Sequence, residues 1–90
     1  MIPLANNLSA HLSANGTTAV KTGPGVLHTV TINTKGATAN TLTLSDGSTT
    51  LAVIDTTAGV GTLTYDIQFQ VGLTAALASG TAADVTISFT

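Results

Sequence analysis

Cysteine, arginine, glutamate and tryptophan are all absent from this 90-residue sequence. Without cysteine, the chain has no disulfide framework, no thiolate nucleophile and no zinc–thiolate site. Only 7% of the residues are charged, as two Lys and four Asp, and the formal net charge is −2. A nucleic-acid-binding surface needs clustered basic side chains, and a disordered charged tail needs a high charge density. The composition therefore excludes both classes, and we expect no nucleic-acid partner.

Long apolar runs are also missing. Thr, Gly or Asp interrupts every apolar stretch well before the roughly 18 residues that a membrane-spanning helix requires. Residues 1–10 have neither the basic start nor the apolar centre of a secretory signal peptide. We therefore expect no membrane association. We also expect a complete gene product that is cytoplasmic or leaves the cell inside a particle.

Threonine is the most conspicuous residue that is present, with 19 of the 90 positions. Its β-branched side chain is stiff and packs well on a pleated sheet. The polar surface must be built from Thr, Ser, Asn and Gln, because so few side chains are charged. A domain of this size buries only a modest core, and oligomerisation often compensates for that. We expect assembly with copies of itself or with a larger scaffold.

The chain divides into an N-terminal arm, residues 1–16, and a β domain, residues 17–90. The first segment shows no sustained alternation of apolar and polar residues, although Leu4, Leu8 and Leu12 recur at a helical spacing. Because the segment is short for a stable isolated helix, we favour an extended arm that becomes ordered only against a partner.

Short strand patterns alternate with turn signals from residue 17 onward, which is typical of sandwiches and barrels. Asp46-Gly47 is a strong hairpin signal because both residue types tolerate a positive φ. We therefore predict an all-β fold, a single antiparallel β-sandwich of about seven to eight strands, either jelly-roll or immunoglobulin-like. The strands expected from the pattern are Thr17–Thr22, Val26–Asn33, Thr41–Ser45, Thr49–Asp55, Thr62–Val71, Leu73–Ala78 and Asp84–Thr90.

Candidate catalytic bases are few. A Ser-His-Asp arrangement needs a positioned histidine, and the chain has only two. His11 lies in the expected arm. His28 lies in mid-strand, where alternation puts it on an apolar face with Val30 and Ile32. A lone histidine in such a place is more often a hydrogen-bonded core or interface residue than a base, so we predict no catalytic residue.

The four aspartates each have a structural explanation. Asp46 lies in the expected hairpin, and Asp66 on the polar face of a strand. Asp55 and Asp84 lie at strand ends, where an aspartate can accept hydrogen bonds from nearby backbone N–H groups.

A calcium site would need clustered carboxylates. The three aromatic residues are too few for a nucleic-acid stacking platform. We predict no enzyme activity, no metal and no cofactor.

Four motifs follow one another along the chain. They are G-V-L-H-x-V-x-I from Gly25, L-x-L-x-D-G from Leu42, I-D from Ile54 and G-T-A-A-D-V-T-I-S-F from Gly80. This order resembles small virion proteins of tailed bacteriophages, of the head decoration or cement type. The motifs are strand and turn patterns rather than catalytic signatures, and the first sixteen residues lie outside the resemblance.

The resemblance implies a non-enzymatic structural protein on the capsid surface of a virion. Decoration proteins bind the outer face of the capsid, commonly as trimers, and clamp neighbouring major capsid proteins. We accordingly expect two partners, the major capsid protein and other copies of this chain, with a homotrimer favoured. Partner contacts are expected from the arm through Ile2, Leu4, Leu8 and Leu12, and from His28 as a subunit contact.

Three other functions stay open. A tail or fibre module that contacts the host surface would need exposed aromatic residues on loops. A subunit of a fibre or tube that stacks head to tail would need a long uncharged edge strand, which Thr62–Val71 could supply. An enzyme or a metal-dependent binding protein would need clustered acids, histidines or cysteines.

Overall fold

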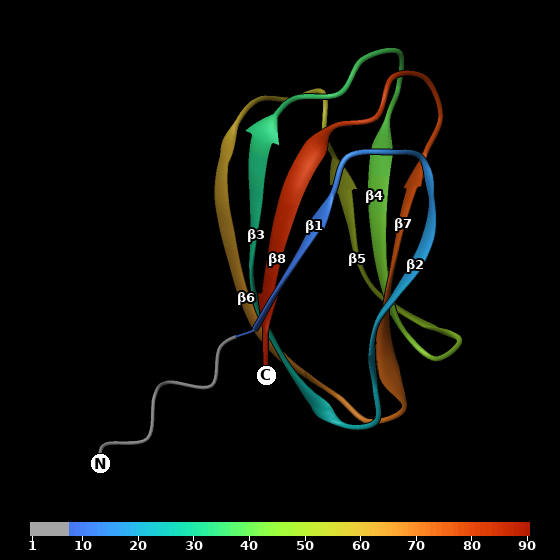
Figure 1. Ribbon diagram of the computed structural model, residues 1–90, viewed down its shortest axis with the longest axis vertical. Coiled ribbons are helices and arrows are strands. Elements are labelled where there is room, and N and C mark those ends of the chain that lie inside the picture. Colours follow the sequence, from blue (N-terminus) through green and yellow to red (C-terminus); the bar gives the residue numbers. More distant parts are fainter. Residues whose placement is uncertain (1–7) are drawn as a thin grey trace.

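Two four-stranded antiparallel sheets make up the part of the chain that the computed structural model describes, residues 8–90 (Figure 1). Sheet A has the strand order β1-β8-β3-β6, and sheet B has the order β2-β7-β4-β5. Within these residues no helix is present, and so none that is long and apolar enough to cross a membrane. The strands are β1 (Leu8–Leu12), β2 (Gly16–Thr22), β3 (Gly25–Thr34), β4 (Thr41–Asp46), β5 (Thr49–Asp55), β6 (Gly61–Phe69), β7 (Gly72–Ala78) and β8 (Asp84–Phe89).

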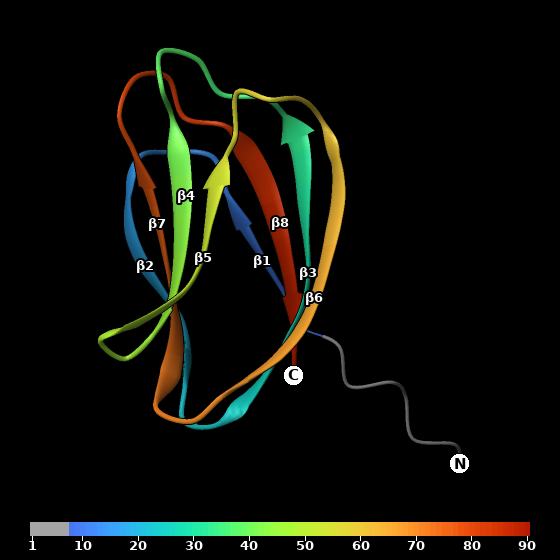
Figure 2. The same cartoon turned by 180° about the vertical axis from the view of Figure 1, so that it is seen from behind.

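Most connections pass from one sheet to the other. Only β4 and β5 are joined within a sheet, by the hairpin at Asp46-Gly47 that the sequence predicts. The connections β1–β2, β3–β4, β5–β6 and β7–β8 gather at one end of the sandwich, and the other three lie at the opposite end (Figures 1 and 2). The two sheets are therefore bound together by crossing loops at both ends.

The core lies between the two sheets and is built from alternate residues of each strand. In β8, for example, Val85, Ile87 and Phe89 are buried while the residues between them are not. Side chains alternate between the two faces of a strand, so one face of each sheet supplies the core. The predicted all-β fold with antiparallel sheets is confirmed. The buried apolar residues are Leu12, Leu27, Val30, Ile32, Leu42, Leu44, Ile54, Phe69, Leu73, Ala75, Leu77, Ala83, Val85, Ile87 and Phe89.

The structure corrects the expected boundary between arm and domain. Residues 8–12 form β1, which pairs with β8 from Leu8↔Phe89 to Leu12↔Val85. Leu12 is only 6% exposed and belongs to the core. The helical spacing of the leucines was misleading, because Leu8, Ala10 and Leu12 also alternate with polar residues at the period of a strand. The β domain therefore includes Leu8–Leu12.

The expectation of which β3 residues face the core was wrong, because the strand contains a β-bulge. The sequence places His28 on the apolar face with Val30, but the buried residues of β3 are Leu27, Val30 and Ile32. The register between β3 and β8 shifts between Leu27 and Thr29, so that two steps on β3 oppose one on β8. Because one extra residue exchanges the two faces of a strand, Leu27 rather than Val26 points into the core.

Asn40 ties together the four connections at one end of the sandwich. It lies between β3 and β4 and is fully buried. Its Nδ2 donates to Asn15 Oδ1 (3.0 Å), in the β1–β2 connection, and to the carbonyl oxygen of Ser79 (2.8 Å), after β7. Its Oδ1 accepts from Thr56 Oγ1 (2.6 Å), after β5, and from the backbone N–H of Ala83 (3.2 Å), before β8. One amide side chain thus contacts every loop at this end.

Candidate functional site

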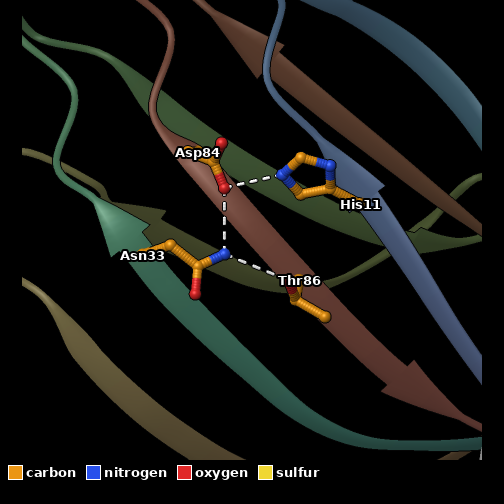
Figure 3. A network of polar contacts seen from close by, with 4 residues as sticks. All are labelled: His11, Asn33, Asp84 and Thr86. Atoms are coloured by element: carbon orange, nitrogen blue, oxygen red, sulfur yellow. Dashed lines mark hydrogen bonds and ion pairs between the residues drawn. The ribbon is translucent and has the colours of Figure 1, made fainter.

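A network of polar side chains crosses three strands on the outer face of sheet A (Figure 3). Asp84 Oδ1 lies 2.7 Å from His11 Nε2 and accepts a hydrogen bond from Asn33 Nδ2 at 2.9 Å. The same Asn33 nitrogen lies 3.0 Å from Thr86 Oγ1, to which it also donates. His11 belongs to β1, Asn33 to β3, and the other two residues to β8. The network therefore holds the edge strand β1 and the central strand β3 to β8.

The electrostatics of this network suit a structural contact. The hydrogen bond from Asn33, and next the neighbouring His11, hold the pKa of the Asp84 carboxyl below its usual value. The side chains of His11 and Asp84 are 59% and 35% exposed, so water screens their attraction. The side-chain partner of His11 in this network is Asp84, on the neighbouring strand β8.

A second polar group lies at the bulge between β3 and β6. His28 Nδ1 is 3.1 Å from Asp66 Oδ1, and His28 Nε2 is 3.4 Å from Thr90 Oγ1. Asp66 has a φ of 50°, in the left-handed region, where the register of β6 against β3 is interrupted. A carboxylate, an imidazole and a hydroxyl follow one another as in a Ser-His-Asp triad. The hydroxyl contact is long, however, and no pocket adjoins the group in the described residues. We assign it to stabilising the bulge.

The outer face of sheet B is different in character. The cross-strand register aligns Thr17, Ala76, Thr43 and Val53 in one row across all four strands. A neighbouring row continues with Ala19, Thr74 and Ser45. We call these seven residues the sheet B face. None of the seven residues is charged. The side chains of the sheet B face therefore present only hydroxyl and methyl groups. The next outward-facing row, formed by Ala78, Thr41 and Asp55, carries one carboxylate, on the edge strand β5.

The residues that the sequence predicts to bind partners differ in exposure and in contacts. Leu8, at the start of β1, is 55% exposed. Leu12 is buried in the protein's own core and has no surface to offer to a partner. His28 is half-buried and paired with Asp66 instead of lying on an apolar face. Ile2 and Leu4 lie outside the described residues. The structure thus leaves Leu8 as the accessible member of the described set.

Sequence reasoning missed the sheet B face and Asn40. Thr43 and Ala76 alternate with buried leucines and alanines, so their outward direction was readable from the pattern. Their alignment in one row depends on which strands are neighbours, and this is decided by the topology. Asn40 stands in a loop whose sequence carries no comparable signal.

The histidines and aspartates of residues 8–90 come together at most in pairs. Among them, no three histidine or aspartate side chains come together, and no pocket is present. Asp55 is engaged with the hydroxyl and the backbone N–H of Thr57, which lower the pKa of its carboxyl. Asp84 is engaged with His11 and Asn33 on sheet A. These two aspartates therefore serve separate local contacts.

Comparisons with protein-family models, curated proteins and solved structures find no match to this chain. Its function is therefore inferred from its own fold and surfaces.

Proposed function

We propose that the chain is a non-enzymatic structural protein of a tailed-bacteriophage virion, which binds the outer capsid surface and stabilises contacts between major capsid proteins. The fold supports this proposal. The two facing sheets have the strand orders 1-8-3-6 and 2-7-4-5, and most connections cross between them. From this we infer an eight-stranded jelly roll rather than an immunoglobulin-like domain. Jelly rolls recur in viral capsid domains and lectins. The motif order from Gly25 to Phe89 points the same way.

The observation that carries the proposal is the uncharged sheet B face. Burying a charged side chain against a partner is costly unless the charge is paired, and ordering a long side chain costs entropy. Thr43, Ala76 and their neighbours carry no charge and have few rotatable bonds, so this face can be covered at small cost. A cement protein acts by burying one of its faces against neighbouring capsid proteins. A capsid presents many identical sites for such a face.

A tail or fibre module that contacts the host surface is the alternative on the same fold. Such a module typically uses exposed aromatic side chains, which supply large contact area at low entropic cost. Here Phe69 and Phe89 are buried, and Tyr65 packs against the core. This placement favours the head surface over the tail.

Co-sedimentation with heads tests the proposal. Purified heads that lack this protein, from the phage that encodes it, are mixed with the wild-type chain and with two lysine variants. Thr43→Lys places a charge in the middle of the sheet B face. Thr31→Lys is the matched control, because Thr31 holds a comparable half-buried position on the outer face of sheet A.

We expect the wild type and Thr31→Lys to bind and Thr43→Lys to bind at least about tenfold more weakly, since a buried unpaired charge costs well over 1.4 kcal/mol. Failure of the wild-type chain to bind heads would refute the decoration role. Loss of binding by Thr31→Lys alone would move the docking surface to sheet A and refute the assignment of the sheet B face.

A further inference from the structure

The edge strand β1 differs from the three other edge strands of the sandwich. In β2, the register against β7 shifts between Ala19 and Lys21. The pairings of β5 with β4 and of β6 with β3 are interrupted in the same way. Such irregularities prevent an edge from pairing with another chain. By contrast, β1 pairs with β8 over five consecutive residues without a shift, and within residues 8–90 its other edge has no partner strand.

The apolar and polar residues of β1 are arranged symmetrically about Ala10. Leu8, Ala10 and Leu12 lie opposite buried residues of β8 and so share the core side of the sheet. Ser9 and His11 lie on the outer side. An antiparallel second copy of β1 centred on Ala10 would place Leu8 opposite Leu12 of the second copy, and Ser9 opposite His11 of the second copy. The core side of the joined sheet would therefore stay apolar across the junction, and the outer side would stay polar.

The composition of β1 also permits this pairing. It contains no Lys or Asp, whereas charged residues are the common means of keeping edges apart. Leu8 is a large apolar residue left 55% exposed at the edge. Pairing with a second copy would satisfy the outer backbone N–H and C=O groups of the strand and remove Leu8 from water.

We propose that two copies of the chain associate through β1, antiparallel about a two-fold axis at Ala10, and join their A sheets into one continuous sheet. Identical surfaces that meet about a two-fold axis are the commonest way in which soluble proteins form oligomers. The two-fold axis stands perpendicular to the paired strands and the sheet, so both sheet B faces point the same way. Such a dimer can lie with both sheet B faces on one capsid surface, and in this respect the inference deepens the proposed function.

The contact is small. Five paired residues per copy bury less than the roughly 1,200–2,000 Å² that stable interfaces bury. We therefore expect a dimer whose population depends on concentration in solution and rises when copies are held close together on a head. A trimer, as in many decoration proteins, would need a different, head-to-tail contact, so the oligomeric state separates the two arrangements.

Cross-linking through an introduced cysteine tests the geometry, because the chain has no cysteine of its own. Directly opposed residues of antiparallel strands have Cα atoms about 4.5–5.5 Å apart, which lies within the range of a disulfide. We expect Ala10→Cys to form a covalent dimer under mild oxidation. Thr64→Cys, on the exposed edge strand β6, is the control and should stay mostly monomeric. Equal cross-linking of the two variants, or none by Ala10→Cys, would overturn the proposal.

Light scattering across a concentration series tests the energetics. We expect the wild type to approach twice its chain mass of 8.9 kDa, and Leu8→Glu to raise the dimer dissociation constant at least about tenfold. Val60→Glu is the control, because Val60 is 68% exposed and lies between β5 and β6. A wild type that stays monomeric up to about millimolar concentration, or a trimer unaffected by Leu8→Glu, would overturn the β1 dimer.

The two proposals fail separately. Thr43→Lys should lose head binding and keep the dimer mass, while Leu8→Glu should lose the dimer and keep the docking face on each copy. Loss of dimer mass by Thr43→Lys would therefore count against pairing through β1, whatever the result with heads.

Discussion

Thr56 donates a hydrogen bond from its hydroxyl to the side-chain oxygen of Asn40, at 2.6 Å, and both residues are completely buried. The same hydroxyl also contacts the Asn40 carbonyl oxygen at 3.0 Å. Asn40 lies in the β3–β4 loop and Thr56 in the β5–β6 loop, so this hydrogen bond joins the two loops. The Nδ2 atom of Asn40 donates to the two remaining loops, at Asn15 and Ser79. The Asn40 side chain therefore connects all four loops at this end of the sandwich.

Asn40→Ala should destabilise the fold strongly. It removes the acceptor of the buried Ala83 N–H and one acceptor of the buried Thr56 hydroxyl, and each unsatisfied buried group costs about 1–3 kcal/mol. We expect the free energy of unfolding to fall by about 3 kcal/mol, measured by urea denaturation. Asn33→Ala, which removes an amide from an exposed network, is the control. An equal loss in the two variants would contradict the importance of burial here.

Gly36→Ala should disturb the same contact from outside. A Cβ atom at Gly36 would lie 2.6 Å from Thr56 Oγ1 and 2.7 Å from Asn40 Oδ1, closer than van der Waals contact allows. Overpacking of this kind costs typically about 1–3 kcal/mol. The clash involves the Thr56 hydroxyl, so the cost of Gly36→Ala should be smaller when Thr56→Ala is also present. Strictly additive losses in urea denaturation would show that the two sites are not coupled.

Acid should destabilise the protein in part through Asp46. The backbone N–H groups of Gln70 and Val71 donate to this carboxylate at 2.9 and 2.8 Å and hold its pKa below the usual value. A pKa that is lowered by folding contributes stability at neutral pH, and this contribution is lost as the pH falls through the lowered value. We expect Asp46→Asn to lower the melting temperature at pH 7 and to flatten its decline below about pH 5. If the melting temperature of Asp46→Asn declined below about pH 5 as steeply as that of the wild type, this assignment would be contradicted.

Truncation should locate the start of the domain. Removal of residues 1–6 leaves all eight described strands, so we expect cooperative thermal unfolding to persist. Removal of residues 1–12 deletes β1 and the buried Leu12 and uncovers β8, so we expect a chain that does not fold. Leu12→Ala alone should cost about 2–5 kcal/mol. A folded product of the longer truncation, judged by circular dichroism, would show that β1 is dispensable.

Local patterning determined most of the strands. Leu42 and Leu44, or Val85 and Ile87, alternate with polar residues because one face of each strand is buried, and this period is visible without knowledge of neighbouring strands. The Asp46-Gly47 turn was likewise readable, since its residue types tolerate the required backbone angles. Each expected strand begins and ends within two residues of the observed one.

Tertiary structure alone decided the rest. Whether Leu8–Leu12 is an arm or a strand depends on β8, which lies more than 70 residues further along the chain. The side on which His28 lies depends on a bulge that β3 forms only against its two neighbours. The role of Asn40 depends on Asn15, Thr56 and Ala83, which meet it only because four crossing loops converge. Alternation is a property of neighbouring residues, whereas register, bulges and buried polar contacts require partners that the fold brings together.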